Sequence, residues 1–137
     1  MGITHVLNTA QGPERQLNLV DTSDDYYDDV GIKFMGIFAL DLSSFNISKY
    51  FKQCSDFIED ALANNGKVFV HCMQGISRSA TIVLAFLMMK RGMNIRDACR
   101  EVRKAREIFP NDGFLYQLCL LQDSPELNAR PAILGKP

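Results

Sequence analysis

The chain has 137 residues, of which 47% are hydrophobic and 23% are charged, and its 15 basic and 16 acidic side chains give a formal net charge of −1. This length and composition fit a single globular domain. A net charge near zero does not favour nucleic acid or an anionic membrane surface as the main partner.

The four cysteines lie far apart in the sequence, without a C-x-x-C pair, and there are only two histidines. Zinc-ligand spacing is therefore absent, and we expect no metal and no other cofactor. Cys54, Cys99 and Cys119 fall on apolar helical faces, so we expect buried thiols rather than disulfides, as suits a reducing compartment. No secretory signal is visible, and the apolar run from Ala80 is too short to span a bilayer. The protein is expected in the cytoplasm, and nuclear entry is left open.

The first third of the chain predicts two strands. Thr4 to Asn8 is β-prone, and residues 31–39 form a second, mostly apolar strand. Between them, residues 21–29 contain five carboxylates. Adjacent carboxylates disfavour one another and show no ligand geometry here, so we interpret this run as a solvated acidic loop rather than a metal site.

A helix is predicted from Asn46 to Asn64, because its apolar residues recur at three- and four-residue steps. Gly66 is the expected C-cap. A buried strand over residues 68–70 follows, then a loop and a helix from Ser79 to about Arg91. That helix is apolar all round, as a helix in the middle of a domain should be.

Two further helices are predicted, and the first has Asn94 as its N-cap and runs over about residues 95–107. Pro110 ends it, and the last helix covers residues 112–122. Residues 124–137 hold three prolines and little periodicity, so they are predicted to be a flexible tail after a domain of residues 1–123. The alternation predicts an α/β fold with a central, mostly parallel sheet flanked by helices.

The segment from His71 to Ser79 carries the strongest chemical signal. A loop between a buried strand and a helix points free backbone N–H groups at an anion. Cys72 opens this loop, and the pKa of a cysteine thiol, ~8.5, falls to ~3.5–7.5 beside a helix N-terminus or a cation. Arg78 closes the loop with a planar fork suited to two phosphate oxygens. Alone, each residue would more often be a core thiol or a solvated cation; together they predict a nucleophile at the base of a phosphate-binding loop.

Residues 71–79 resemble the signature loop of the cysteine-dependent protein tyrosine phosphatase superfamily, and residues 80–89 resemble its dual-specificity branch. Other similar segments, in the family's order, are 2–8, 39–41 and 111–118. The resemblance covers about residues 2–122 and points to the small atypical dual-specificity protein phosphatases. Relatives have a strand and a helix before the segment that matches residues 2–8, so we expect a domain that is short at its N-terminus.

The resemblance implies a role for each matching position. Cys72 attacks phosphorus and carries the phosphoryl group as a phosphocysteine. Asp41 acts as the general acid and later as the base, unless it only caps the following turn. The phosphate is held by the Arg78 side chain and by the backbone N–H groups of Met73, Gln74, Gly75, Ile76, Ser77 and Arg78.

Three more residues are assigned roles near the loop. Ser79 is expected to donate to the Cys72 sulfur, with N-capping of the helix as the alternative or an additional role. His71 is expected to act indirectly, by shaping the loop and the pKa of Cys72. Arg106 resembles a position that contacts a second phosphate in relatives, and a solvated helix face is the alternative.

The substrate class is inferred from the same residues. The loop has no lysine, which argues against lipid head groups, and the short segment around Asp41 implies a pocket shallow enough for phosphoserine and phosphothreonine as well as phosphotyrosine. Expected partners are phosphorylated proteins, such as signalling kinases or transcription factors. The protein itself is expected to be a monomer or a weak dimer. The alternatives are a non-catalytic phosphoprotein-binding protein and an RNA or lipid phosphatase.

Overall fold

The computed structural model describes residues 2–12, 31–72 and 77–128, apart from the side chains of residues 126 and 128. Several predictions lie outside this part of the chain. They are the acidic loop at 21–29, the phosphate contacts of Met73, Gln74, Gly75 and Ile76, and the tail beyond residue 128.

Three parallel strands form the sheet, β1 (His5–Asn8), β2 (Lys33–Gly36) and β3 (Val68–His71), in the order β2-β1-β3. The α/β fold with a parallel sheet is confirmed. The strand predicted over residues 68–70 is present as β3, but the prediction that it is buried is wrong, because β3 lies to one side of β1 in the described strands. Every residue of β1 is buried, whereas Phe69 of β3 is 48% exposed, and the most buried strand of a parallel sheet takes the middle.

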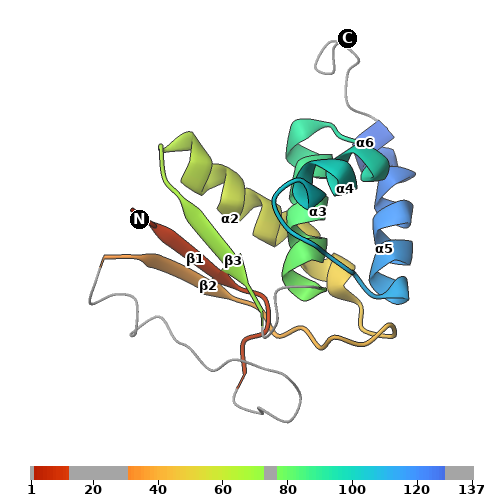
Figure 1. Ribbon diagram of the computed structural model, residues 1–137, viewed down its shortest axis with the longest axis horizontal. Coiled ribbons are helices and arrows are strands. Elements are labelled where there is room, and N and C mark those ends of the chain that lie inside the picture. Colours follow the sequence, from red (N-terminus) through yellow and green to blue (C-terminus); the bar gives the residue numbers. More distant parts are fainter. Residues whose placement is uncertain (1, 13–30, 73–76, 129–137) are drawn as a thin grey trace.

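Five α-helices and a 3₁₀ turn accompany this sheet in the described residues. The chain enters α2 (Phe51–Ala63) through the turn η2 (Ile47–Tyr50). The later helices are α3 (Arg78–Arg91), α4 (Ile95–Arg103), α5 (Asp112–Gln122) and α6 (Pro125–Asn128). In Figure 1, the sheet lies on the left, α2 lies next to it, and α3 to α6 gather on the right.

Helix α3 lies in the middle of the helical layer, since it contacts α2, α4, α5 and β3. Nine of its residues are buried, which confirms the predicted buried helix. The core around it includes Leu7, Ile47, Leu84, Phe114 and Leu118. No helix in the described part of the chain is both long and apolar enough to cross a bilayer.

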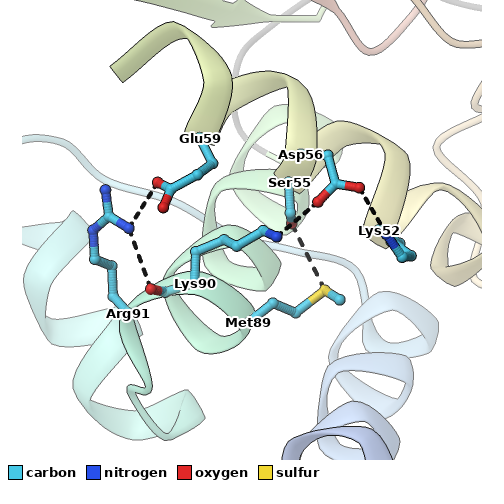
Figure 2. A network of polar contacts seen from close by, with 7 residues as sticks. All are labelled: Lys52, Ser55, Asp56, Glu59, Met89, Lys90 and Arg91. Atoms are coloured by element: carbon cyan, nitrogen blue, oxygen red, sulfur yellow. Dashed lines mark hydrogen bonds and ion pairs between the residues drawn. The ribbon is translucent and has the colours of Figure 1, made fainter. Parts of the chain in front are cut away.

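Polar contacts fix α3 against α2 (Figure 2). Two ion pairs join α3 to α2, Lys90 with Asp56 at 2.7 Å and Arg91 with Glu59 at 2.8 Å, whereas Lys52 with Asp56 at 2.8 Å lies within α2. Hydrogen bonds from Lys52 and Lys90 lower the pKa of Asp56. Because both carboxylates are over a third exposed, such pairs contribute little each, about 0.2–1 kcal/mol; they orient a helix that the buried apolar residues already hold.

Helix α4 ends at Arg103, before the predicted end near residue 107. The N–H of Arg106 donates to the carbonyl of Val102, in a turn that leads Ile108, only 1% exposed, into the core. Arg106 therefore lies in a turn and not on a helix face.

The end of α2 also differs from the prediction. The left-handed residue is Asn65, with φ of 59°, and not Gly66. Gly66 is required for another reason, because a Cβ there would lie 2.5 Å from Thr4 Oγ1 and 2.8 Å from the Ala61 carbonyl oxygen. Close approach of the chain to the start of β1 excludes a side chain at this position.

Residues 125–128 form the short helix α6, where a loose segment was expected. The Ser124 hydroxyl donates to the carbonyl of Leu121 at 2.7 Å, and Leu127 packs against the core. The chain is therefore ordered for at least one turn beyond α5.

Candidate active site

Cys72, Arg78 and Ser79 meet where β3 ends and α3 begins. Cys72 directly follows β3, and Arg78 and Ser79 lie in the first turn of α3. Cys72 Sγ is 3.5 Å from Ser79 Oγ, within hydrogen-bond distance. All three residues are buried. A sulfur atom and a hydroxyl are thus in contact at the carboxyl end of β3, where open α/β folds bind their ligands, and the buried Arg78 precedes Ser79 in the chain.

The buried guanidinium of Arg78 reaches the segment that carries Asp41. Its Nη1 donates to the carbonyl oxygen of Ala39 at 2.9 Å. A buried charge of this kind is tolerated only with hydrogen-bond partners, so the contact fixes both chain segments. Ala39 stands two residues before Asp41, and Arg78 therefore helps to set where the acid loop, residues 40–46, begins.

Asp41 itself is exposed, and its Oδ1 accepts a hydrogen bond from Nδ2 of Asn111 at 2.9 Å. The turn after it closes through the backbone, where the Phe45 N–H donates to the carbonyl of Leu42. The structure thus ties the Asp41 carboxylate to the start of α5. Its role as general acid stays a prediction.

Asn111 has no predicted role of its own, although it lies in the segment 111–118, which resembles the family. Its backbone N–H donates to Ser77 Oγ at 3.0 Å, and its side-chain Oδ1 accepts from the Phe114 N–H at 2.8 Å. The second bond makes Asn111 the N-cap of α5, a signal that an Asn before an apolar helix gives in the sequence. Its contact with Asp41, 70 positions away, carries no local signal.

The same helix holds the acid loop at two more places. A Cβ on Gly113 would lie 1.9 Å from the carbonyl oxygen of Ser43, so only glycine allows the loop to pass this close. Further along α5, Gln117 Nε2 donates to the carbonyl of Phe45 at 2.8 Å. The amide oxygen of Gln117 accepts the Ser48 N–H at 2.8 Å.

Ser77, and not Ser79, occupies the N-cap position of α3. The Ser77 side chain accepts from Asn111, while its carbonyl accepts both the N–H and the hydroxyl of Thr81. Ser79 lies inside the helix and faces Cys72. The alternative that Ser79 caps the helix is therefore wrong, and its predicted contact with the sulfur is present.

His71 contacts the neighbouring backbone rather than the thiol. Its ring stacks on Phe69 with centroids 5.1 Å apart. Burial lowers the pKa of His71, and a hydrogen bond to the Cys72 backbone acts in the opposite direction. Thr9, which the sequence did not single out, donates through its N–H and its hydroxyl to the His71 carbonyl at 2.8 and 2.9 Å. This arrangement fits an indirect role for His71, which stays a prediction.

All four cysteines are free thiols, as expected. Cys72 packs with Ala10 and Leu40. Burial raises the pKa of Cys54 to about 12 and also raises that of Cys99. Cys119 is exposed, so the prediction that it is buried is wrong.

Arg106 is exposed. Among the described residues, the structure gives no contact between it and Cys72, Arg78 or Asp41. Its predicted contact with a second phosphate is neither supported nor contradicted. In the same part of the chain, no group of three or more His, Cys, Asp or Glu side chains is placed to hold a metal ion.

Comparison with known proteins gives one consistent result. The family model "Dual specificity phosphatase, catalytic domain" matches residues 1–124. The human tyrosine phosphatase-like serine/threonine/tyrosine-interacting protein is 32% identical with a TM-score of 0.73, over 89% of this chain and 78% of that one. DUSP15 is 30% identical with a TM-score of 0.72, over 93% and 76% of the two chains. Human DUSP28 is 26% identical with a TM-score of 0.73, over 89% and 76%.

Proposed function

Because the chain belongs to the dual-specificity phosphatase family, we propose that it hydrolyses phosphate monoesters on phosphotyrosine, phosphoserine and phosphothreonine of proteins through a phosphocysteine intermediate. The observation that carries the proposal is the contact between Cys72 and Ser79 next to the buried Arg78 in the first turn of α3, with Asp41 tied to the start of that helix through Asn111. Nucleophile, cation, hydroxyl and acid are the groups that this chemistry needs.

In the first step, the Cys72 thiolate attacks phosphorus in line. The S–P bond forms as the ester P–O bond breaks, and Asp41 gives its proton to the departing oxygen. Arg78 and the backbone N–H groups of the loop stabilise the charge on the equatorial oxygens.

In the second step, Asp41 takes a proton from water as that water attacks phosphorus. The S–P bond breaks, inorganic phosphate forms, and the Cys72 thiolate returns. Ser79, with its hydroxyl 3.5 Å from the sulfur, donates a hydrogen bond to the leaving thiolate. Positioned acid–base catalysis of this kind contributes about 10²–10⁴ in rate.

Turnover of an aryl phosphate by the purified chain tests the proposal. Cys72→Ser should abolish turnover, because a serine hydroxyl is not ionised at neutral pH. Cys119→Ser is the matched control, since it changes an exposed thiol away from the loop and should retain full activity. Equal activity of wild type and Cys72→Ser would refute the phosphocysteine route.

One relative supports a second candidate function. A protein whose name calls it phosphatase-like and interacting is 32% identical to this chain, so binding of phosphoproteins without turnover is the alternative. Phosphatase relatives that only bind typically lose the nucleophile, and Cys72 is present here. Tight binding of phosphopeptides with no phosphate release by wild type would favour this alternative.

The substrate class needs a separate comparison. Phosphopeptides carrying phosphotyrosine or phosphothreonine should be hydrolysed with higher kcat/KM than phosphoinositides or RNA 5′-triphosphates, because the phosphate-binding loop has no lysine. A preference for phosphoinositides or RNA would replace the protein substrate while leaving the chemistry at Cys72 intact.

A further inference from the structure

Asn111 binds three different segments of the chain, through its backbone N–H, its side-chain oxygen and its side-chain nitrogen. Its backbone N–H donates to the Ser77 hydroxyl, next to Arg78 in the phosphate-binding loop. Its side-chain oxygen accepts the Phe114 N–H and so begins α5. Its side-chain nitrogen donates to Asp41 Oδ1. One side chain and its backbone thus join the acid loop to the loop that holds phosphate.

We propose that Asn111 is a positioning residue, which holds the Asp41 carboxylate in a fixed place relative to the phosphate-binding loop. This inference rests on the proposed function, in which Asp41 is the general acid. Asp41 is an exposed side chain at a loop, so its carboxyl group has several rotamers unless a partner selects one. The amide of Asn111 selects one by engaging Oδ1, which leaves Oδ2 for the departing oxygen.

The orientation of the Asn111 amide is fixed by its own partners. An amide presents an acceptor at one end and donors at the other. The Phe114 N–H can only meet the oxygen, so the NH₂ group must point toward Asp41. The bond from the Asn111 backbone to the buried Ser77 hydroxyl then sets the distance between this amide and the phosphate-binding loop.

Two other residues of α5 show that this helix supports the acid loop as a whole. Gly113 allows the Ser43 carbonyl to approach without a side chain between them, and Gln117 binds the Phe45 carbonyl. With the backbone of the loop held at these points, the bond from Asn111 adds control of the carboxylate itself. Displacement of a reacting group by about 1 Å can cost about 10²-fold in rate.

Asn111→Ser should keep the cap of α5 while removing the bond that positions Asp41. Serine keeps an oxygen that accepts the Phe114 N–H, since serine is as good an N-cap as asparagine, but it has no donor that reaches Asp41. Asn94→Ser is the matched control. Asn94 caps α4 in the same way, by accepting the Asp97 N–H at 2.8 Å, and its position is exposed. Both variants should change the melting temperature alike.

The kinetic readout is the dependence on the leaving group. An aryl phosphate that releases an acidic phenol needs little help from a general acid, whereas phenyl phosphate needs its proton. Asn111→Ser should lower kcat/KM for phenyl phosphate about 10- to 100-fold, because kcat/KM reports the steps up to the phosphocysteine, in which the leaving group departs. It should lower kcat/KM for the activated ester less than about threefold, while Asn94→Ser should match wild type on both substrates.

A second comparison uses Asp41→Asn. If Asn111 acts through Asp41, then Asn111→Ser added to Asp41→Asn should cause no further loss. Equal losses of kcat/KM on the two substrates, or an additional loss in the Asp41→Asn background, would overturn the positioning role. Failure of the proposed function looks different: wild type would turn over neither substrate, or Asp41→Asn would lose nothing on phenyl phosphate, and the inference about Asn111 would then fail with it.

Discussion

Cys54 and Cys72 show how two buried thiols of one chain differ in their surroundings. Cys54 has no exposed surface and packs in the apolar core, and burial alone raises its pKa to about 12. Cys72 lies instead beside the hydroxyl of Ser79 and just before a helix N-terminus. A thiol is reactive only where its surroundings favour the anion, so Cys54 is a core side chain and Cys72 the candidate nucleophile.

The raised pKa of Cys54 predicts a loss of stability at alkaline pH. In the unfolded chain this thiol ionises near its ordinary value of 9.0, whereas in the folded protein it stays protonated to about 12. Its contribution to stability is complete below pH 9.0 and decreases as pH rises toward 12, by about 1.4 kcal/mol per pH unit. Denaturant unfolding of wild type and Cys54→Ala across this range checks it, because the difference in free energy of unfolding between the two proteins should shrink as pH rises. A pH-independent difference would contradict the buried, protonated thiol.

At the scale of elements, α5 determines where the acid loop lies. Its N-cap, its first turn and its middle each contact this loop or the residues just after it, through Asn111, Gly113 and Gln117. Helix α3 holds the residue just before the loop, through the bond between Arg78 and Ala39. The loop is therefore placed by two helices that are adjacent in the fold.

Gly113→Ala tests whether helix propensity or packing against the acid loop decides the stability at this position. Alanine favours a helix over glycine by about 0.5–1 kcal/mol, but its Cβ would overlap the Ser43 carbonyl. We expect packing to prevail, with a lower melting temperature and a lower kcat because the acid loop must move. Tyr116→Ala, on an exposed position of the same helix, is the control and should change kcat little. A more stable and fully active Gly113→Ala protein would show that the loop is not held against α5.

The whole molecule places one sheet edge, one buried helix and two loops around a single site. Strand β3 delivers Cys72, α3 delivers Arg78 and Ser79, and the contacts of α3 with α2, α4, α5 and β3 keep these parts together. A ligand in such a site binds the folded chain and not the unfolded one, so it must stabilise the whole domain.

Inorganic phosphate, as the product, should therefore raise the thermal stability of the domain. At 100 times its Kd, the expected gain is about 2.7 kcal/mol in free energy of unfolding. Chloride at the same ionic strength controls for screening and should give no such gain. Asp41→Asn should keep the phosphate effect, because Asp41 serves the leaving group and not the bound anion. An equal gain from chloride would argue against a specific anion site.

Local patterns were sufficient for most of the elements. Apolar spacing predicted the helix before β3, an apolar run predicted the core helix at α3, and Asn94 was predicted correctly as an N-cap. The errors fall where tertiary packing matters, as at the end of α2, where Gly66 approaches Thr4 closely, and after α4, where the chain leaves the helix and Ile108 is buried. The spacing from Cys72 to Arg78 identified the candidate site without a structure.

By itself, the sequence determined the order of strands and helices and the chemistry of the loop at residues 71–79, because both depend on residues near one another in the chain. Only the tertiary structure decided that Asn111 binds Asp41 and that Gly113 packs against the Ser43 carbonyl. The two residues of each pair are about 70 positions apart in the chain. Such contacts depend on how α5 and α3 pack around the core, and no local pattern of side chains encodes that geometry.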